Sequence, residues 1–215
     1  MKLNLILSRL GRELKEKNML RERMLSDARK ILKLSKESII LIHRGKVKAA
    51  EKRLKTAEKI LGKAFEELEG HPELKYGGAM STACQEYAEA KIFLGLEEGR
   101  FPPPEEVGVD LQSYLLGLAD VPGELRRKVI EELMAGRIKE AERKFRLMEE
   151  IYAGLMALDE HVFSLVSGLR RKCDIVRHLL ELTGSDLVLE LRQQRLEEAL
   201  KTLEKHASKS RRRKR

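Results

Sequence analysis

The sequence contains no tryptophan, and aromatic side chains supply only 4% of its 215 residues. Stacking of bases on aromatic rings is therefore excluded as the main source of any affinity for nucleic acid. Cysteine is almost as scarce, because only Cys84 and Cys173 are present and no CxxC spacing occurs. This pattern disfavours a zinc ribbon or a thioredoxin-type redox site. We expect both cysteines to be reduced thiols in the core.

Long hydrophobic runs are also missing. No apolar stretch approaches the roughly 18 residues that a membrane-spanning helix needs. The first residues become charged too early for a secretory signal peptide. With 42% hydrophobic residues the chain is nevertheless able to bury a substantial core. We expect one cytoplasmic domain over residues 1–207 that has no contact with membranes.

Proline is rare and its positions divide the chain. Pro72 and the run at 102–104 fall between helical patterns, whereas Pro122 alone interrupts one. Apolar residues recur with helical period almost everywhere, and no long stretch alternates as a strand would. The sequence predicts an all-α stack of about seven helices. We expect them over 3–43 (as one helix or two in line), 46–68, 80–96, 110–133, 137–157, 159–183 and from 185 onward.

Charge is abundant and unevenly placed. Charged residues make up 37% of the chain, and the formal net charge is +9. A basic tail at 208–215 contributes six of these nine charges, so the rest of the chain is only weakly basic. We expect this tail to be disordered. The tail would either add sequence-independent affinity for phosphates or keep the protein soluble.

Two pairs of acidic residues stand among small and apolar neighbours. Glu86 and Glu89 are spaced i,i+3, and Asp120 and Glu124 are spaced i,i+4, so each pair projects from one face of a helix. Alanine, serine and glycine on the same faces would allow the two helices to approach closely. Four converging carboxylates without histidine or cysteine favour Mg²⁺ or Mn²⁺ over zinc. The spacing alone also fits two solvated acidic faces.

Pro122 lies between the acids of the second pair. It removes one backbone hydrogen bond, the one that the carbonyl of Leu118 would accept, and it predicts a kink between Asp120 and Glu124. Such a kink would serve either packing or function. A departure from regular helical structure beside charged residues favours a functional site.

The sequence motifs that contain these acids resemble those of the translin and Trax family, and specifically those of Trax. QEYAEA at Gln85–Ala90 and YLLGLADVPGEL at Tyr114–Leu125 match the two acidic motifs of that family. SKESIILIHRGK at Ser35–Lys46 and the stretch Leu169–Gln193 extend the likeness over essentially the whole chain. At Ala88, Val121 and Pro122 the sequence differs from the Trax motifs.

The resemblance implies a fold, an activity and an assembly. It implies an all-helical protomer of about seven helices in a closed octameric shell, in which Trax-type chains supply a Mg²⁺-dependent endoribonuclease site. Translin itself binds nucleic acid without the full acidic set. By position, the catalytic and metal-binding acids of the family fall on Glu86, Glu89, Asp120 and Glu124.

Basic side chains are expected to hold the RNA backbone. A stripe on the first helix and a pair that follows the second acidic motif are the candidates: Arg29, Lys33, Lys36, His43, Arg44, Arg126 and Arg127. A solvated helix face explains the stripe as well, and salt bridges to Glu131 explain the pair. We expect contacts to phosphate and ribose, with little reading of sequence.

The favoured function is a Mg²⁺-dependent endoribonuclease that acts on single-stranded RNA within a homo-oligomeric shell, most simply an octamer. The alternative is a non-catalytic, translin-like protein that binds single-stranded nucleic acid. A ferritin-like oxidase is disfavoured, because neither acidic motif contains Glu-x-x-His. Apolar surface for assembly is expected on the last helix, at Leu187, Leu191, Leu196, Leu200 and Leu203.

Overall fold

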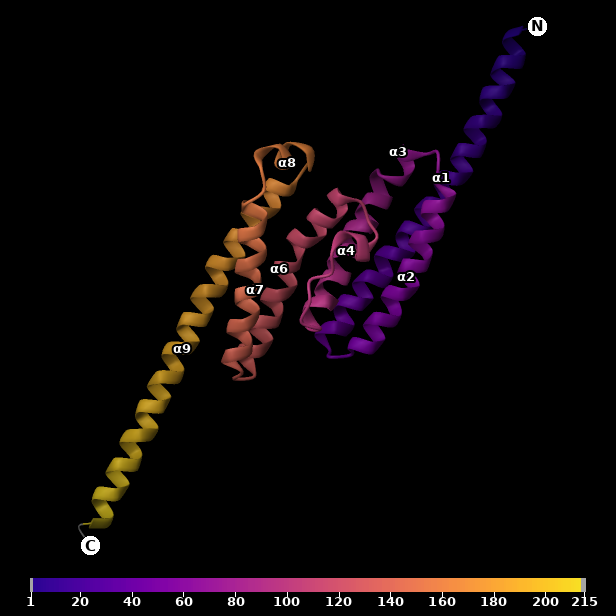
Figure 1. Ribbon diagram of the computed structural model, residues 1–215. Coiled ribbons are helices and arrows are strands. Elements are labelled where there is room, and N and C mark those ends of the chain that lie inside the picture. Colours follow the sequence, from indigo (N-terminus) through magenta and orange to yellow (C-terminus); the bar gives the residue numbers. More distant parts are fainter. Residues whose placement is uncertain (1, 214–215) are drawn as a thin grey trace. The chain divides into compact units, whose positions relative to one another are not determined.

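The computed structural model describes residues 2–213, with side chains as far as residue 205. The described part of the chain contains nine helices and no strand, which confirms the all-α prediction (Figure 1). The predicted basic tail at 208–215 falls among residues whose side chains lie outside the described part, so its disorder stays a prediction. The helices are α1 (Lys2–His43), α2 (Val47–Glu67), α3 (Pro72–Lys75), α4 (Gly78–Glu97), α5 (Pro104–Val107), α6 (Leu111–Met134), α7 (Ile138–Met156), α8 (Glu160–Leu165) and α9 (Leu169–Arg213).

The chain forms two compact units. The first contains Met1–Val121 with Glu160–Leu169, and the second contains Pro122–Asp159 with Arg170–Arg215. The boundary lies inside α6, immediately before Pro122, and α6 passes through that proline as one helix.

In the first unit, α1 packs against both α2 and α4. Ile31 and Ile42 of α1 meet a core that includes Leu54 of α2 and Phe93 of α4, and all four side chains are almost fully buried. The chain turns back from α1 into α2 at Gly45, whose φ of 70° favours glycine. The predicted helix over 3–43 is therefore confirmed, as one helix.

The second unit has a core of its own. Val129 of α6, Met148 of α7, and Cys173 and Val176 of α9 are all buried. Cys84 is buried in the first unit, and both cysteines are free thiols. The expectation of reduced core thiols is confirmed.

The number of helices differs from the predicted seven, for local reasons. The predicted turns after α2 and after α4 each contain a four-residue helix, α3 and α5, that begins at a proline. The predicted helix over 159–183 is divided after α8, because Gly168 adopts a φ of 86°. The predicted break before Ser185 is wrong, since Gly184 stays helical inside α9.

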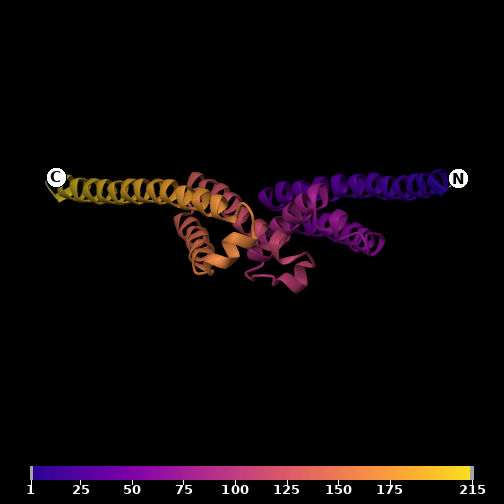
Figure 2. The same ribbon diagram turned by 90° about the horizontal axis from the view of Figure 1, so that it is seen from above.

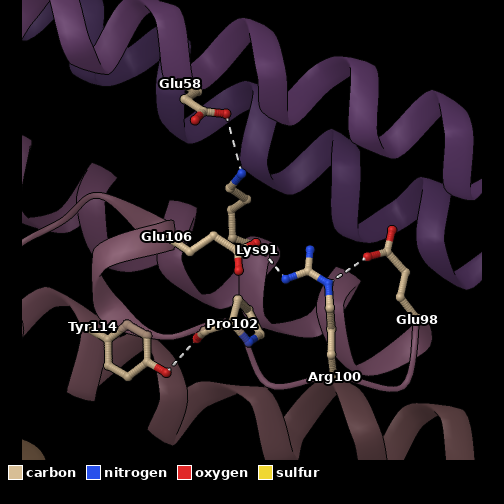
Figure 3. A network of polar contacts seen from close by, with 7 residues as sticks. All are labelled: Glu58, Lys91, Glu98, Arg100, Pro102, Glu106 and Tyr114. Atoms are coloured by element: carbon tan, nitrogen blue, oxygen red, sulfur yellow. Dashed lines mark hydrogen bonds and ion pairs between the residues drawn. The ribbon is translucent and has the colours of Figure 1, made fainter.

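Polar contacts within the first unit hold the proline-rich loop between α4 and α6 in place. Arg100 pairs with Glu98 at 3.1 Å and with Glu106 of α5 at 2.5 Å (Figure 3). The Tyr114 hydroxyl donates to the carbonyl of Pro102 at 2.8 Å. These contacts fix where α6 begins relative to α4.

None of the helices in the described range is long and apolar enough to cross a membrane.

The contact between α4 and α6 is unusually close at Gly117. A Cβ at this position would lie 2.7 Å from the carbonyl oxygen of Gln85 and 2.8 Å from the amide nitrogen of Glu89. Both atoms belong to the backbone of α4 and cannot move aside easily. Only glycine therefore allows the two acidic motifs to approach as they do, which confirms the expectation that small residues bring these helices together.

We expect Gly117→Ala to lower the free energy of unfolding by about 1–3 kcal/mol, because the added methyl group forces the two backbones apart. Urea unfolding followed by circular dichroism measures the change. Gly123→Ala is the matched control in the same helix, since a Cβ there meets nothing within 4 Å. The control should keep or slightly increase stability. Equal stability of the two variants would contradict the close contact.

Candidate functional site

Three of the four predicted acids lie in the first unit. Glu89 is the most buried of them, with 9% of its surface exposed, and Glu86 and Asp120 are half-buried. The Gln85 side-chain amide donates to Asp120 Oδ2 at 2.7 Å, across the α4–α6 contact. Carboxylates on two facing helices thus border the junction at Gly117.

Glu86 links this acidic site to α1. Lys36 Nζ lies 3.8 Å from Glu86 Oε1, and the Lys36 side chain is otherwise well exposed. The sequence placed Lys36 on a basic stripe and Glu86 in the acidic site, but it gave no relation between them. The structure brings the stripe and the acids together at this ion pair.

Glu124 belongs to the second unit, because the boundary falls between it and Asp120. It is half-buried and engaged in an interaction of its own. Pro122, buried within α6, cannot donate a backbone hydrogen bond to the carbonyl of Leu118. The predicted role of Glu124 as fourth ligand stays a prediction.

The donor chemistry of the acidic site fits a hard divalent cation. All candidate ligands are carboxylate oxygens, and one of them, Glu89, is buried, where a charge needs a partner. Among the described residues, however, no three histidine, cysteine or acidic side chains are close enough together to hold a metal ion. A bound cation would therefore draw Asp120 from Gln85 and Glu86 from Lys36.

Two other polar side chains of α4 are unsuited to proton transfer. Burial, with a smaller contribution from Asp110, raises the pKa of the Cys84 thiol to about 12. Burial, together with the nearby Glu58, also raises the pKa of the Tyr87 hydroxyl. Both groups stay protonated at neutral pH, so neither can accept a proton there.

Most of the predicted basic stripe is available on the surface of α1. Arg29, Lys33, Lys36 and Arg44 are exposed, and Lys33 Nζ lies 3.9 Å from Glu37 Oε1. His43 differs, because its half-buried ring packs against Phe93 with the ring centroids 5.3 Å apart. The structure thus shows a packing contact for His43 and leaves its predicted contact with RNA untested.

A small apolar pocket adjoins the stripe. It has a volume of about 290 Å³ and lies between α1 and α4, where Ala28, Arg29 and Leu32 face Ala79 and Thr82. The Arg29 side chain is part of its lining.

The two arginines after the acidic motif have different partners. Arg126 donates to Thr183 Oγ1 at 2.6 Å and to Asp186 Oδ2 at 3.0 Å, so its guanidinium joins α6 to α9 within the second unit. Arg127 is exposed and lies 3.6 Å from Glu131, the alternative that the sequence offered. Arg127 is therefore the freer of the two for a phosphate.

Gln85 is the site residue that sequence reasoning missed. It belongs to the acidic motif itself, but an amide beside two glutamates gives no signal of its own. Its partner, Asp120, is 35 residues away, and only the packing of α4 on α6 reveals the pair.

Comparison with known sequences finds one family and one related protein. A family model described as the translin family matches residues 19–181. An uncharacterized protein of Methanocaldococcus jannaschii is 35% identical over 195 residues, which cover 89% of this chain and 85% of that protein.

Solved structures agree with this match. A complex of AfC3PO with duplex RNA superposes with a TM-score of 0.78 at 36% identity, covering 87% of this chain and 97% of that chain. A crystal structure of AfC3PO gives a TM-score of 0.79, also at 36% identity and with the same coverage of both chains. Apo-NeC3PO gives 0.75 at 29% identity, over 86% of this chain and 96% of that chain.

Proposed function

Because this chain belongs to the translin family, we propose that it binds RNA and cleaves it with the help of a divalent cation, Mg²⁺ or Mn²⁺. The proposal assigns Lys33, Lys36 and their neighbours on α1 to the RNA backbone. It assigns the carboxylates at the α4–α6 contact to the cation. It also takes the chain as the Trax-like catalytic type within the family.

The observation that carries the proposal is the ion pair between Lys36 and Glu86. Cationic side chains of the stripe attract phosphates, since each contact releases counterions from the RNA. A backbone that follows the stripe reaches Lys36 and so passes beside the acidic site. Binding and cleavage would then use adjoining surfaces of one unit.

Each group has a separate task in this proposal. Glu86, Glu89 and Asp120 are the carboxylates that would hold the cation, and Glu124 is the fourth candidate ligand expected from the sequence. The cation would supply an activated water and neutralise charge on the phosphate oxygens. Whichever of these four carboxylates the cation leaves unbound would accept the proton of the water. Gln85 positions Asp120 while the cation is absent, through its hydrogen bond of 2.7 Å.

The substrate is recognised through phosphate and ribose. With few aromatic residues, the chain has little means of stacking bases, and the stripe offers positive charge without a pattern for base edges. Single-stranded RNA remains the favoured substrate. The AfC3PO complex contains duplex RNA, and both forms therefore belong in the assay.

A homo-oligomer, favoured as an octamer, is part of the proposal. Of the five leucines expected to form the contact surface on α9, Leu196, Leu200 and Leu203 are exposed. Leu187 is buried and Leu191 is half-buried, so these two belong to the packing of the chain itself. The apolar surface for assembly is therefore farther along α9 than the sequence indicated.

The second candidate is an RNA-binding protein without catalysis. It is favoured by one observation, that the described acids do not form a group of three ready to bind a metal ion. The two candidates agree on RNA binding and differ in whether Mg²⁺ produces cleavage.

We expect purified protein to cleave labelled single-stranded RNA with Mg²⁺ and to leave it intact with chelator. Glu89→Gln and Asp120→Asn should each lower cleavage at least about 100-fold, because each removes one charged ligand at nearly constant volume. RNA binding and helical content should stay close to those of the unchanged protein.

Glu66→Gln is the matched control, since Glu66 is an exposed glutamate of the same unit, away from the acidic site. Gel analysis of single-stranded and duplex RNA measures the rates. Cleavage by both site variants at the unchanged rate would refute the acidic site. Binding without cleavage by the unchanged protein would select the non-catalytic candidate.

For the stripe, we expect the double variant Lys33→Ala with Lys36→Ala to weaken RNA binding. The slope of log affinity against log salt should decrease in magnitude by up to about two units, because two phosphate contacts are lost. Fluorescence anisotropy at several salt concentrations measures it. Lys52→Ala with Lys59→Ala removes the same charge from exposed positions of α2 and should have a smaller effect. An equal change in both double variants would place the RNA elsewhere.

A further inference from the structure

The first part of α1 extends past the helices that cover the rest of it (Figures 1 and 2). Every side chain from residue 2 to residue 18 is exposed. The last contacts with the end of α2 and with α3 are the ion pairs of Arg23 with Glu67 at 4.0 Å and of Lys17 with Glu73 at 2.5 Å. We call residues 2–18 the α1 arm.

The α1 arm carries one continuous apolar face. Leu3, Leu7, Leu10 and Leu14 alternate at spacings of four and three residues, and each is 41–66% exposed. This is the a and d pattern of a helix that packs lengthwise against another helix.

The same register continues into the core of the first unit. Counting onward by three and four residues from Leu14, past Lys17 and Arg21, reaches the buried face of α1 that α2 and α4 cover. Its members are Met24, Ala28, Ile31, Ser35, Ser38 and Ile42. The apolar face of the α1 arm is therefore the continuation of an established helix-packing face, beyond the point where α2 ends.

Apart from Lys17, which continues the register at the end of the α1 arm and pairs with Glu73, charged residues of the arm lie away from this face. On a helical projection Lys2, Arg9, Arg12 and Lys15 lie on the flanks and back of the arm, and Arg9 is held 3.5 Å from Glu13. The positions that border the apolar face, Asn4, Ile6, Gly11 and Glu13, contain no basic residue. Two copies of the face can therefore meet without bringing like charges together.

We propose that the α1 arm pairs with the α1 arm of a second copy of this chain, antiparallel, as a two-stranded coiled coil. An isologous pair of this kind closes on itself through a two-fold axis. It covers the apolar face of both arms at once. The inference goes beyond the proposed function and does not depend on RNA binding or cleavage.

The antiparallel direction follows from α2. Because the chain reverses at Gly45, α2 runs antiparallel to α1 along the buried face. An arm that arrives from a second copy in the antiparallel direction continues the line of α2 along the same face. A parallel arm would instead bring the two α2 helices to the same end of the coiled coil, where both need the same space.

The spacing of the leucines fixes the register of greatest overlap. In an antiparallel coiled coil each a position meets a d position of the other helix. Leu7 then lies opposite the partner subunit's Leu10, and Leu3 lies opposite the partner subunit's Leu14. The whole α1 arm precedes residue 19, where the translin family match begins, so the contact lies outside the matched region.

Disulfide cross-linking of the full-length chain tests the pairing. Leu7→Cys and Leu10→Cys chains, one of them carrying a size tag, are co-expressed, oxidised and run on a non-reducing gel. Both native thiols are buried, and burial raises the pKa of each, so they do not compete. We expect a mixed dimer of the two variants as the main cross-linked product.

The controls separate the alternatives. Leu7→Cys co-expressed with Arg12→Cys should yield little mixed dimer, because position 12 lies on the outer side of the α1 arm. Cross-linking of Leu7→Cys chains with one another would indicate parallel arms and overturn the proposal. Absence of the mixed dimer in folded, fully oxidised protein would also overturn it, and would leave the end of α9 or a lipid surface to cover the α1 arm.

Discussion

The backbones of α4 and α6 touch at Gly117, and the arrangement of the acidic side chains depends on that contact. No side chain separates the two helices there, so Glu89 and Asp120 are carried toward one junction. A larger residue would push the helices apart and spread the carboxylates. Gly117 therefore sets the distance between acidic side chains that lie on two helices and are remote in sequence.

Around this contact, α1 combines several roles along its 42 residues. Its buried face completes the core of the first unit. Its exposed face carries the basic stripe, and Lys36 connects that stripe to Glu86. Its first residues form the α1 arm, whose described side chains are all exposed. A single helix therefore contains part of the core, the proposed surface for phosphate and the proposed surface for a second copy, on different faces or at different points along its length.

Periodicity predicted most helices and both acidic motifs, since burial of one face leaves a regular trace in the sequence. It could not separate Gly168, which ends a helix, from Gly184, which does not, because the difference lies in backbone conformation and not in composition. Nor could it reveal that Arg126 would bind Thr183 and Asp186 rather than Glu131. That choice is made by the packing of α6 on α9. The same holds for Gln85, whose partner comes from another helix.

Anomalous diffraction from crystals grown with Mn²⁺ shows whether the acidic site binds a cation, because it locates the ion without reference to activity. We expect a strong peak beside Glu86, Glu89 and Asp120, with Asp120 released from Gln85. A fully occupied Mn²⁺ elsewhere, with these three carboxylates still bound to their present partners, would contradict it.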